Sequence, residues 1–194
     1  DLLGRFNASN LLAVVATLVA LGWPLETIRE AVARIRSIPG RMEPFHHPDG
    51  STLVVDYAHT PGALASALMA LREHSNGRVH CIFGCGGERD RGKRALMAAA
   101  AERHADMVIL TDDNPRGEDP LAIINDIQGG FLRGPRMVHR DRREAMLVAL
   151  AAASPGDMIL VAGKGHEDVQ IDGSGRHYYS DRQTARELTG EGGP

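Results

Sequence analysis

The residues with the clearest chemical potential are four consecutive ones, Asp113, Asn114, Pro115 and Arg116. Pro115 restricts the backbone of a turn, Asn114 offers a donor and an acceptor, and Arg116 can bind a carboxylate through two parallel hydrogen bonds. They follow the apolar run 107–111, which is typical of a buried parallel strand. Because ligands of open α/β sheets bind beyond the carboxyl ends of strands, a ligand site is expected here. Taken alone, Asp-Asn-Pro is also ordinary turn sequence.

A second candidate loop is the hexapeptide 56–61, which lies at the end of another apolar run. Pro61 is typical of the first turn of a helix, and the free N–H groups of a helix N-terminus can bind phosphate. Asp56 could accept a hydrogen bond from a ribose hydroxyl. The residues leave a second interpretation open, in which Asp56 and His59 only satisfy the backbone of the loop.

A third loop, residues 84–94, resembles a phosphate-binding loop only superficially. Gly87 to Lys93 has the spacing G-x-x-x-x-G-K, but Arg94 stands where a Ser or Thr would hold Mg²⁺. We therefore reject that interpretation. We expect the glycines to form a turn from which Arg89 projects into a cleft, and we expect Lys93 and Arg94 at the start of a helix.

The fourth loop, residues 162–167, directly follows the apolar run 158–161. Its two glycines allow a ligand to approach the backbone closely, and Glu167 could bind an ammonium group. Across the four loops the chemistry is two arginines, an amide, a carboxylate and accessible backbone, which suits a zwitterion. No serine or cysteine nucleophile with a partnered base stands out, and no histidine spacing indicates zinc.

Alternating strands and helices must position these loops. Such alternation is typical of a mostly parallel sheet covered by helices on both faces, and we predict a Rossmann-like α/β fold. The segment 172–175, Asp-Gly-Ser-Gly, indicates a turn and so an antiparallel edge hairpin. The predicted strands are near 51–57, 79–84, 107–111, 136–139 and 158–162, and the predicted helices near 61–73, 92–104, 120–130, 141–153 and 181–189.

Two further helices are predicted before this α/β region. Asn7 or Ser9 could cap a helix over about 10–21, and a second helix is expected over about 25–37. The apolar run 11–21 is too short to span a bilayer, so a buried helix explains it better than a membrane segment.

The breaker cluster at residues 37–41 predicts a domain boundary. The chain starts at Asp1, within what looks like a folded element, and we expect it to be part of a longer protein. Residues 1–38 are expected to belong to a preceding domain and residues 39–194 to form one domain. The glycine-rich tail 190–194 is expected to fray.

Composition argues against several classes of function. The net charge of -3 gives no electrostatic attraction to nucleic acid or anionic membranes, and with 4% aromatic residues a base-stacking surface is not expected. Cys81 and Cys85 are expected on one face of a strand as buried, reduced thiols rather than as a disulfide or metal site. We therefore expect a cytoplasmic protein without nucleic-acid or membrane partners.

Six segments together resemble the Mur ligases, in the family's order and spacing. The resemblance extends over essentially the whole chain, and is most specific to the members that add meso-diaminopimelate. It implies a C-terminal Mur ligase domain preceded by the last helices of a central ATP-binding domain. The segments are residues 6–10, 39–43, 56–61, 84–94, 113–116 and 163–167.

The resemblance also implies a reaction and roles for individual residues. ATP phosphorylates the terminal carboxylate of UDP-MurNAc-L-Ala-D-Glu, and the amine of meso-diaminopimelate attacks the acyl phosphate during the synthesis of peptidoglycan precursors. The residues implied in binding diaminopimelate are Arg89, Asp113, Asn114, Pro115, Arg116, Gly163 and Glu167. Those implied in binding ATP are Asn7, Asn10, Arg41, Asp56 and His59.

The same resemblance implies that the catalytic and Mg²⁺-binding residues lie upstream of Asp1. We expect ATP and Mg²⁺ to serve the longer enzyme, no cofactor to bind this chain tightly, and the chain to be inactive without its missing domains. Two alternatives remain. One is a related folylpolyglutamate- or cyanophycin-type ligase, and the other is a non-catalytic Rossmann-like module that binds a nucleotide or an amino acid.

Overall fold

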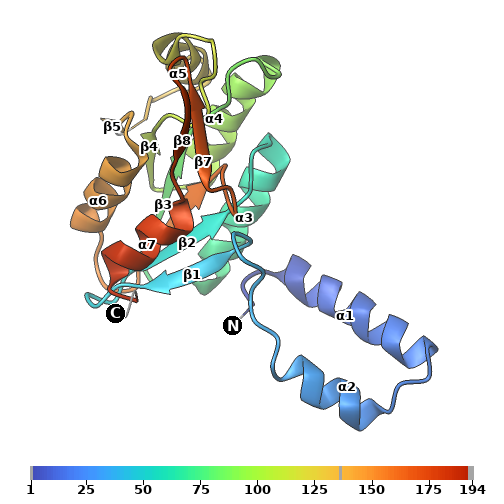
Figure 1. Ribbon diagram of the computed structural model, residues 1–194. Coiled ribbons are helices and arrows are strands. Elements are labelled where there is room, and N and C mark those ends of the chain that lie inside the picture. The colour runs from blue at the N-terminus through green and yellow to red at the C-terminus, as the bar shows by residue number, and fades with distance from the viewer. Residues whose placement is uncertain (1, 136, 192–194) are drawn as a thin grey trace.

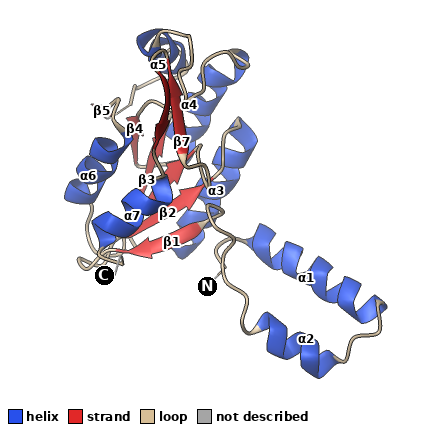
Figure 2. Cartoon of the chain, in the orientation of Figure 1, coloured by secondary structure: helices blue, strands red, loops and turns tan. Residues whose placement is uncertain are grey.

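The computed structural model describes residues 2–135 and 137–191, which form an α/β body with two projecting helices (Figure 1, Figure 2). One sheet has the strand order β1-β2-β6-β3-β4-β5, with β1 antiparallel and the other strands parallel. The predicted mostly parallel α/β fold is confirmed. The strands of this sheet are β1 (Glu43–His46), β2 (Thr52–Asp56), β3 (Val79–Phe83), β4 (Met107–Leu110), β5 (Met137–Val138) and β6 (Met158–Ala162).

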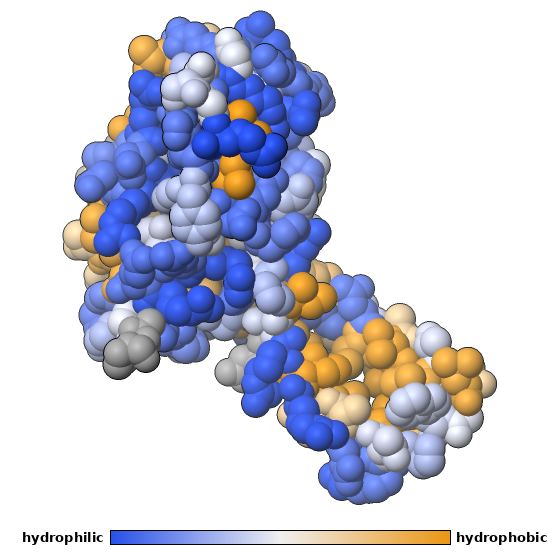
Figure 3. Space-filling model, in the orientation of Figure 1, coloured by the Kyte–Doolittle hydropathy of each residue, from blue (hydrophilic) through white to orange (hydrophobic). Residues whose placement is uncertain are grey.

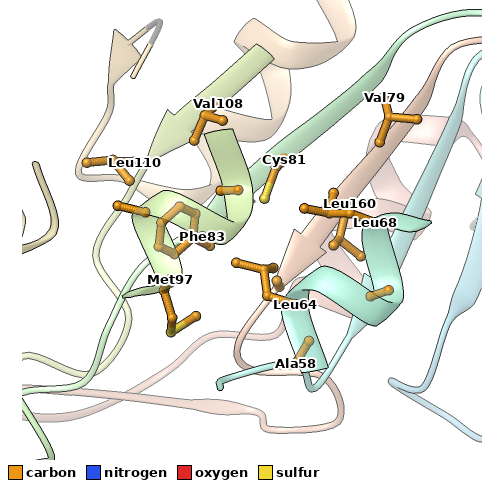
Figure 4. Close-up of a cluster of buried hydrophobic side chains, with 14 of the residues drawn as sticks. Ala58, Leu64, Leu68, Val79, Cys81, Phe83, Met97, Val108, Leu110 and Leu160 are labelled. Carbon is orange, nitrogen blue, oxygen red and sulfur yellow. The ribbon is translucent and has the colours of Figure 1, made fainter. Parts of the chain in front are cut away.

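Helices cover both faces of this sheet, as predicted. Because successive side chains of a strand point to opposite faces, the strands contribute to two buried clusters. Cys81 and Phe83 pack with residues of α3 and α4 (Figure 4), and Ile82 packs with residues of α6. On one face lie α3 (Pro61–His74), α4 (Gly92–His104) and α5 (Pro120–Gln128), and on the other α6 (Arg142–Ala152) and α7 (Asp181–Thr189).

Capping side chains fix where the helices begin, and so where the preceding loops end. In α3, α5, α6 and α7, the residue before the helix accepts a hydrogen bond from a backbone N–H of the first turn. Pro61 and Pro120 then occupy the first helical position, where a missing N–H removes no helical hydrogen bond. The four capping residues are Thr60, Asp119, Asp141 and Ser180.

The two projecting helices, α1 (Arg5–Ala20) and α2 (Leu25–Val32), differ from the prediction at their ends. The predicted caps are wrong: Gly4 precedes α1, whereas Asn7 and Ser9 lie inside it and donate to carbonyls one turn earlier. Helix α2 stops before the predicted end because the N–H groups of Arg34 and Ile35 bond to carbonyls three residues back instead of four. The expectation of a buried helix over the run 11–21 is also wrong, because no residue of α1 is buried. None of the described helices, α1 included, has the length and apolar character that crossing a membrane requires.

Strand β1 was not predicted, because Pro44 argues against a strand in so short a run. At the edge of a sheet a proline is tolerated, and the neighbouring Phe45 packs into the core. The predicted hairpin is present: β7 (Val169–Asp172) and β8 (Gly175–Tyr178) pair antiparallel and form a separate two-stranded sheet.

The two cysteines are free thiols buried in the same cluster. Cys81 lies in β3, whereas Cys85 lies beyond the end of that strand rather than within it. Burial raises the pKa of the Cys85 thiol to about 12 and that of Cys81 further still. Both are therefore protonated at neutral pH and serve as small apolar core residues.

Candidate functional site

The loops that follow β2, β3, β4 and β6 meet at the carboxyl edge of the sheet, because these strands are parallel neighbours. They enclose a pocket of about 430 Å³, which we call the sheet-edge pocket. Pro115 does not line it. Its carbonyl instead packs against Gly87, where a Cβ would lie 1.9 Å from the Pro115 oxygen. The other residues predicted to bind the amino acid all line the pocket: Arg89, Asp113, Asn114, Arg116, Gly163 and Glu167.

Arg116 is held so that one edge of its guanidinium group is unused. Its φ is +55°, and its backbone N–H donates to the Ile171 carbonyl at 3.0 Å. Nη1 donates to the carbonyls of Gly87 and Asn114, at 2.9 and 3.2 Å. Within the described chain, Nε and Nη2 have no partner, and this is the pair that binds a carboxylate side-on.

Asn114 has most of its hydrogen-bonding capacity used by the protein. Its Oδ1 accepts from the Lys164 ammonium at 3.1 Å and from the Ile171 N–H at 3.0 Å, which fills both lone pairs. Its Nδ2 donates to Glu167 Oε2 at 3.2 Å. One N–H therefore remains for a ligand, rather than the donor and acceptor that the residue type offers.

Asp113 and Glu167 give the pocket negative charge. Asp113 is 9% exposed, and this burial raises the pKa of its carboxyl. The Glu167 side chain is 36% exposed, and among the described residues its Oε1 has no hydrogen-bond partner. Gly163 has φ +116°, and a Cβ there would lie 3.0 Å from Asp113 Oδ2, so glycine leaves room for that carboxylate. The pocket thus offers a carboxylate-binding edge and an ammonium-binding oxygen.

Lys164 belongs to this site but was not predicted. It is fully buried, and its ammonium contacts Asn114 and Glu167 from below the pocket rather than lining it. A lysine between two glycines directly after an apolar strand is an unusual signal, since lysine is almost never fully buried without partners. The sequence alone could not show which partners it has.

The cations at the start of α4 have separate roles. Arg89 is exposed at the rim of the sheet-edge pocket, and Lys93 Nζ donates to a carbonyl of the loop after β2 at 2.9 Å. Arg94 is buried and bonds to Glu118 and Asp126. The hydrogen bonds from Arg94 lower the pKa of Glu118 to about 2. Arg94 therefore fastens the start of α4 to α5.

A second pocket of about 470 Å³, here called the helical pocket, lies between α1, the segment before β1, and α3. It brings together Asn7, Asn10, Arg41 and Asp56, four of the residues predicted to bind ATP. Its remaining wall is largely apolar, with Phe6, Ile38, Ala63 and Ala67. A flat aromatic base and a polar sugar are ligands of suitable character for such a wall.

Asp56 also satisfies the backbone of its own loop, which is the alternative role that its sequence context left open. Its Oδ2 accepts from the Met42 N–H and its Oδ1 from the Ala58 N–H, each at 2.8 Å. Burial raises the pKa of this carboxyl. Each oxygen retains one lone pair, so satisfying the loop backbone does not prevent Asp56 from accepting a further hydrogen bond.

Tyr57 stands between the two pockets. The Arg41 guanidinium lies over its ring at 4.8 Å from the centroid, and Arg41 lines the helical pocket. His59 and His166 contact the Tyr57 ring, with centroid distances of 4.6 and 5.3 Å. Tyr57 and His59 line the sheet-edge pocket, so the structure places His59 apart from the other residues predicted to bind ATP.

The segment before β1 packs directly on the loop after β6. Gly40 has φ +69°, and a Cβ there would lie 2.2 Å from the His166 nitrogen and 2.3 Å from the Gly165 carbonyl carbon. Gly165 has φ +52°, and a Cβ there would lie 2.7 Å from the Gly40 oxygen. Glycine at both positions is what permits this backbone-to-backbone contact.

Residues 40–165 match the family described as Mur ligase, glutamate ligase domain, and the chain belongs to the Mur ligase family. It is similar to a solved UDP-N-acetylmuramoyl-L-alanyl-D-glutamate–2,6-diaminopimelate ligase, with 42% identity and a TM-score of 0.76 over 98% of this chain. The match covers 39% of that ligase.

Two further solved structures share the fold. A folylpolyglutamate synthase of Mycobacterium tuberculosis, complexed with ADP and AMPPCP, is 25% identical, with a TM-score of 0.68 over 97% of this chain and 41% of that one. The UDP-N-acetylmuramate–alanine ligase MurC of Thermotoga maritima is 21% identical, with a TM-score of 0.66 over 98% and 38%. The chain thus spans about two fifths of each of these relatives.

Proposed function

We propose that this chain is the amino-acid-binding part of an ATP-dependent ligase that adds meso-diaminopimelate to UDP-MurNAc-L-Ala-D-Glu. The observation that carries the proposal is the sheet-edge pocket, in which the free edge of Arg116 and the free oxygen of Glu167 face one ligand space. The 42% identity to a diaminopimelate ligase supports the same assignment.

In this proposal the pocket holds the end of diaminopimelate that does not react. Arg116 binds the carboxylate of this end through Nε and Nη2, and the remaining Asn114 N–H donates to the same carboxylate. Glu167 Oε1 accepts from the amine. Arg89, at the rim, pairs with the second carboxylate. Lysine lacks one of these carboxylates, so binding lysine would leave an arginine desolvated without a partner, which polar sites reject strongly.

The helical pocket is proposed to bind part of ATP. Asn7 and Asn10 lie beside its apolar wall, where a base would stack, and Arg41 supplies positive charge for phosphate. His59 stays a predicted nucleotide contact, although it lines the other pocket. Among the described residues no group of three or more His, Cys, Asp or Glu side chains is arranged to hold a metal.

We further propose that residues 1–38 belong to the central ATP-binding domain and residues 39–194 to the C-terminal domain. The helical pair projects from the body and exposes apolar side chains (Figure 3), which a preceding domain would cover. These exposed side chains are Leu12, Val14, Val19, Leu21, Trp23 and Leu25. The activating chemistry would then come from preceding domains, and the substrates place the enzyme in the cytoplasm.

The test is ATP-dependent ligation by the whole enzyme with a panel of amino acids. We expect product with meso-diaminopimelate and less than about 1% of that rate with lysine at equal concentration. The chain by itself should give no product. Efficient use of lysine or glutamate by the whole enzyme would contradict the proposal, and turnover by the isolated chain would contradict the need for other domains.

A further inference from the structure

Lys164 is a fully enclosed cation beside the sheet-edge pocket, with 0% of its side chain exposed. Its Nζ donates to the Val169 carbonyl at 2.6 Å and to Asn114 Oδ1 at 3.1 Å. It lies 3.5 Å from Glu167 Oε2 and 3.9 Å from Asp113 Oδ1. One ammonium group therefore joins the loop after β4, the loop after β6 and the first residue of β7.

We propose that Lys164 is a positioning residue that orients Asn114 and Glu167 for the amine of a diamino acid. This rests on the proposed function, and adds to it the group that shapes the amine end of the pocket. Lys164 does not touch the ligand, because it lies below the residues that line the pocket.

The orientation follows from the hydrogen bonds that each group can make. A carboxamide can flip by 180° unless its neighbours distinguish the oxygen from the nitrogen. The Lys164 ammonium and the Ile171 N–H are both donors only, so together they require the Asn114 oxygen to face them and Nδ2 to face Glu167. Glu167 Oε2 is then held between Nδ2 and the ammonium, which leaves Oε1 for the ligand.

The charges around Lys164 point to the same role. Its positive charge stands between two carboxylates that the ligand amine must find ionised, Asp113 and Glu167. The nearby guanidinium of Arg142 is already bonded to Asp181 through Nε and Nη2. Without Lys164, two like charges would share a buried site with less compensation, and protonation of one would become easier. The charged groups facing Lys164 are Asp113, Glu167, Arg142 and Asp181.

A lysine that served the fold alone would make different predictions. Its removal would lower the stability of the protein and would affect both substrates similarly. A positioning lysine determines the orientation of the Asn114 carboxamide and the KM for the diamino acid, and its removal changes kcat and the KM for ATP little. The two roles can therefore be separated by experiment.

The decisive variant is Lys164→Met, which keeps the length of the side chain and removes the charge. In the chain itself, ¹⁵N NMR should show the side-chain amide signals of Asn114 change position and their protons exchange faster with water, because the carboxamide loses a donor that holds its oxygen. Lys93→Met is the matched control, because Lys93 lines the same pocket but bonds to a loop carbonyl instead of Asn114. The control should leave the Asn114 amide signals as they are in the wild type. Unchanged Asn114 amide signals in Lys164→Met would overturn the proposal.

In the whole enzyme, Lys164→Met should raise the KM for diaminopimelate about tenfold or more, with less than about twofold change in kcat and in the KM for ATP. If the wild-type enzyme does not use diaminopimelate, the proposed function fails and the role of Lys164 fails with it. If the wild type uses it and the variant has the wild-type KM, only the role of Lys164 fails.

A measurement on the wild-type chain covers the case in which the variant does not fold. The Lys164 ammonium protons should exchange slowly with water and show a contact with the side chain of Asn114. Rapid exchange without that contact would overturn the proposal, whatever the variant does.

Discussion

Two buried polar clusters at opposite edges of the sheet use their hydrogen bonds differently. At the carboxyl edge, Asn114 and Glu167 are held by Lys164 and still keep one donor and one acceptor oxygen without protein partners. At the amino edge, His80 and Asp157 are 1% and 3% exposed, with 3.2 Å between Nε2 and Oδ2. Asp157 also accepts two backbone N–H groups, which ties the amino ends of β3 and β6 together.

The difference distinguishes buried polar groups that can bind a ligand from buried polar groups that only stabilise the fold. A structural cluster directs its hydrogen bonds inward and opens to no ligand space. A binding cluster directs some inward, to fix orientation, and leaves others facing a pocket. Arg94 and Arg116 both donate to carbonyls of the loop after β3, and the same comparison assigns Arg94 to the fold and supports the proposed binding role of Arg116.

The largest expected effect is that of Arg116→Ala in the whole enzyme. Because a ligand carboxylate would lose a charge-assisted pair that is worth on the order of 2–5 kcal/mol, we expect the KM for diaminopimelate to rise at least about 100-fold. Steady-state kinetics with diaminopimelate as the varied substrate measures this.

Arg116→Lys is the matched control for this variant. It keeps the positive charge and loses the planar edge, so its KM should fall between those of the wild type and Arg116→Ala. A wild-type KM in Arg116→Ala would show that the free guanidinium edge does not bind the substrate, and would contradict a binding role for the polar groups at the carboxyl edge.

A smaller effect is expected for Arg41→Ala, which sharpens the separation of the two pockets. Arg41 is exposed beside the helical pocket, so we expect the KM for ATP to rise about tenfold, equivalent to about 1.4 kcal/mol. The KM for diaminopimelate should change less than about threefold. Arg36→Ala removes a nearby exposed charge that does not line the pocket, and serves as the control. Equal changes for both substrates would contradict separate roles.

The smallest effect concerns the amino edge and is seen in stability rather than in kinetics. Burial lowers the pKa of His80 below its usual 6.5, and among the described residues nothing pairs with its Nδ1. The unfolded state therefore takes up a proton first, so stability is full above about pH 6.5 and falls as the pH is lowered towards the folded-state pKa. The slope is at most about 1.4 kcal/mol per pH unit.

His80→Gln should flatten this pH dependence, because glutamine can still donate to Asp157 but does not titrate. Urea denaturation of the chain between about pH 5 and 8 measures the slope. The pKa of Asp157 is lowered from 3.8, so its own contribution is lost only at more acidic pH. The same slope in both proteins would show that His80 does not control acid stability.

Most of the fold could be predicted because the periodicity of the sequence and the packing agree. The runs that became β2, β3, β4 and β6 are apolar apart from Thr52, Asp56 and His80, as is typical of parallel strands buried on both faces. The prediction of secondary structure failed where tertiary contacts determine it. Strand β1 exists because it pairs with β2 at an edge that tolerates Pro44, and Ser9 lies within a helix although its type favours a cap.

The candidate site could be predicted to the level of residue type and loop, but not of hydrogen bonding. Arg116 and Glu167 were identifiable because charged side chains after apolar strands have few structural explanations. Lys164 was not, because its partner Asn114 is 50 residues away in the sequence and the two meet only in the fold. Likewise, Asp56 could be placed at a strand end, but its two backbone partners could not be foreseen.

The contact between Gly40 and Gly165 has a mechanical consequence. Two backbones that touch without side chains have no rotamers with which to absorb a displacement. A rotation of the helical pair relative to the sheet would have to pivot before Gly40, in the segment that follows α2, or else push the loop that carries Lys164 and Glu167. Movement of the helical pair would in this way change the shape of the sheet-edge pocket.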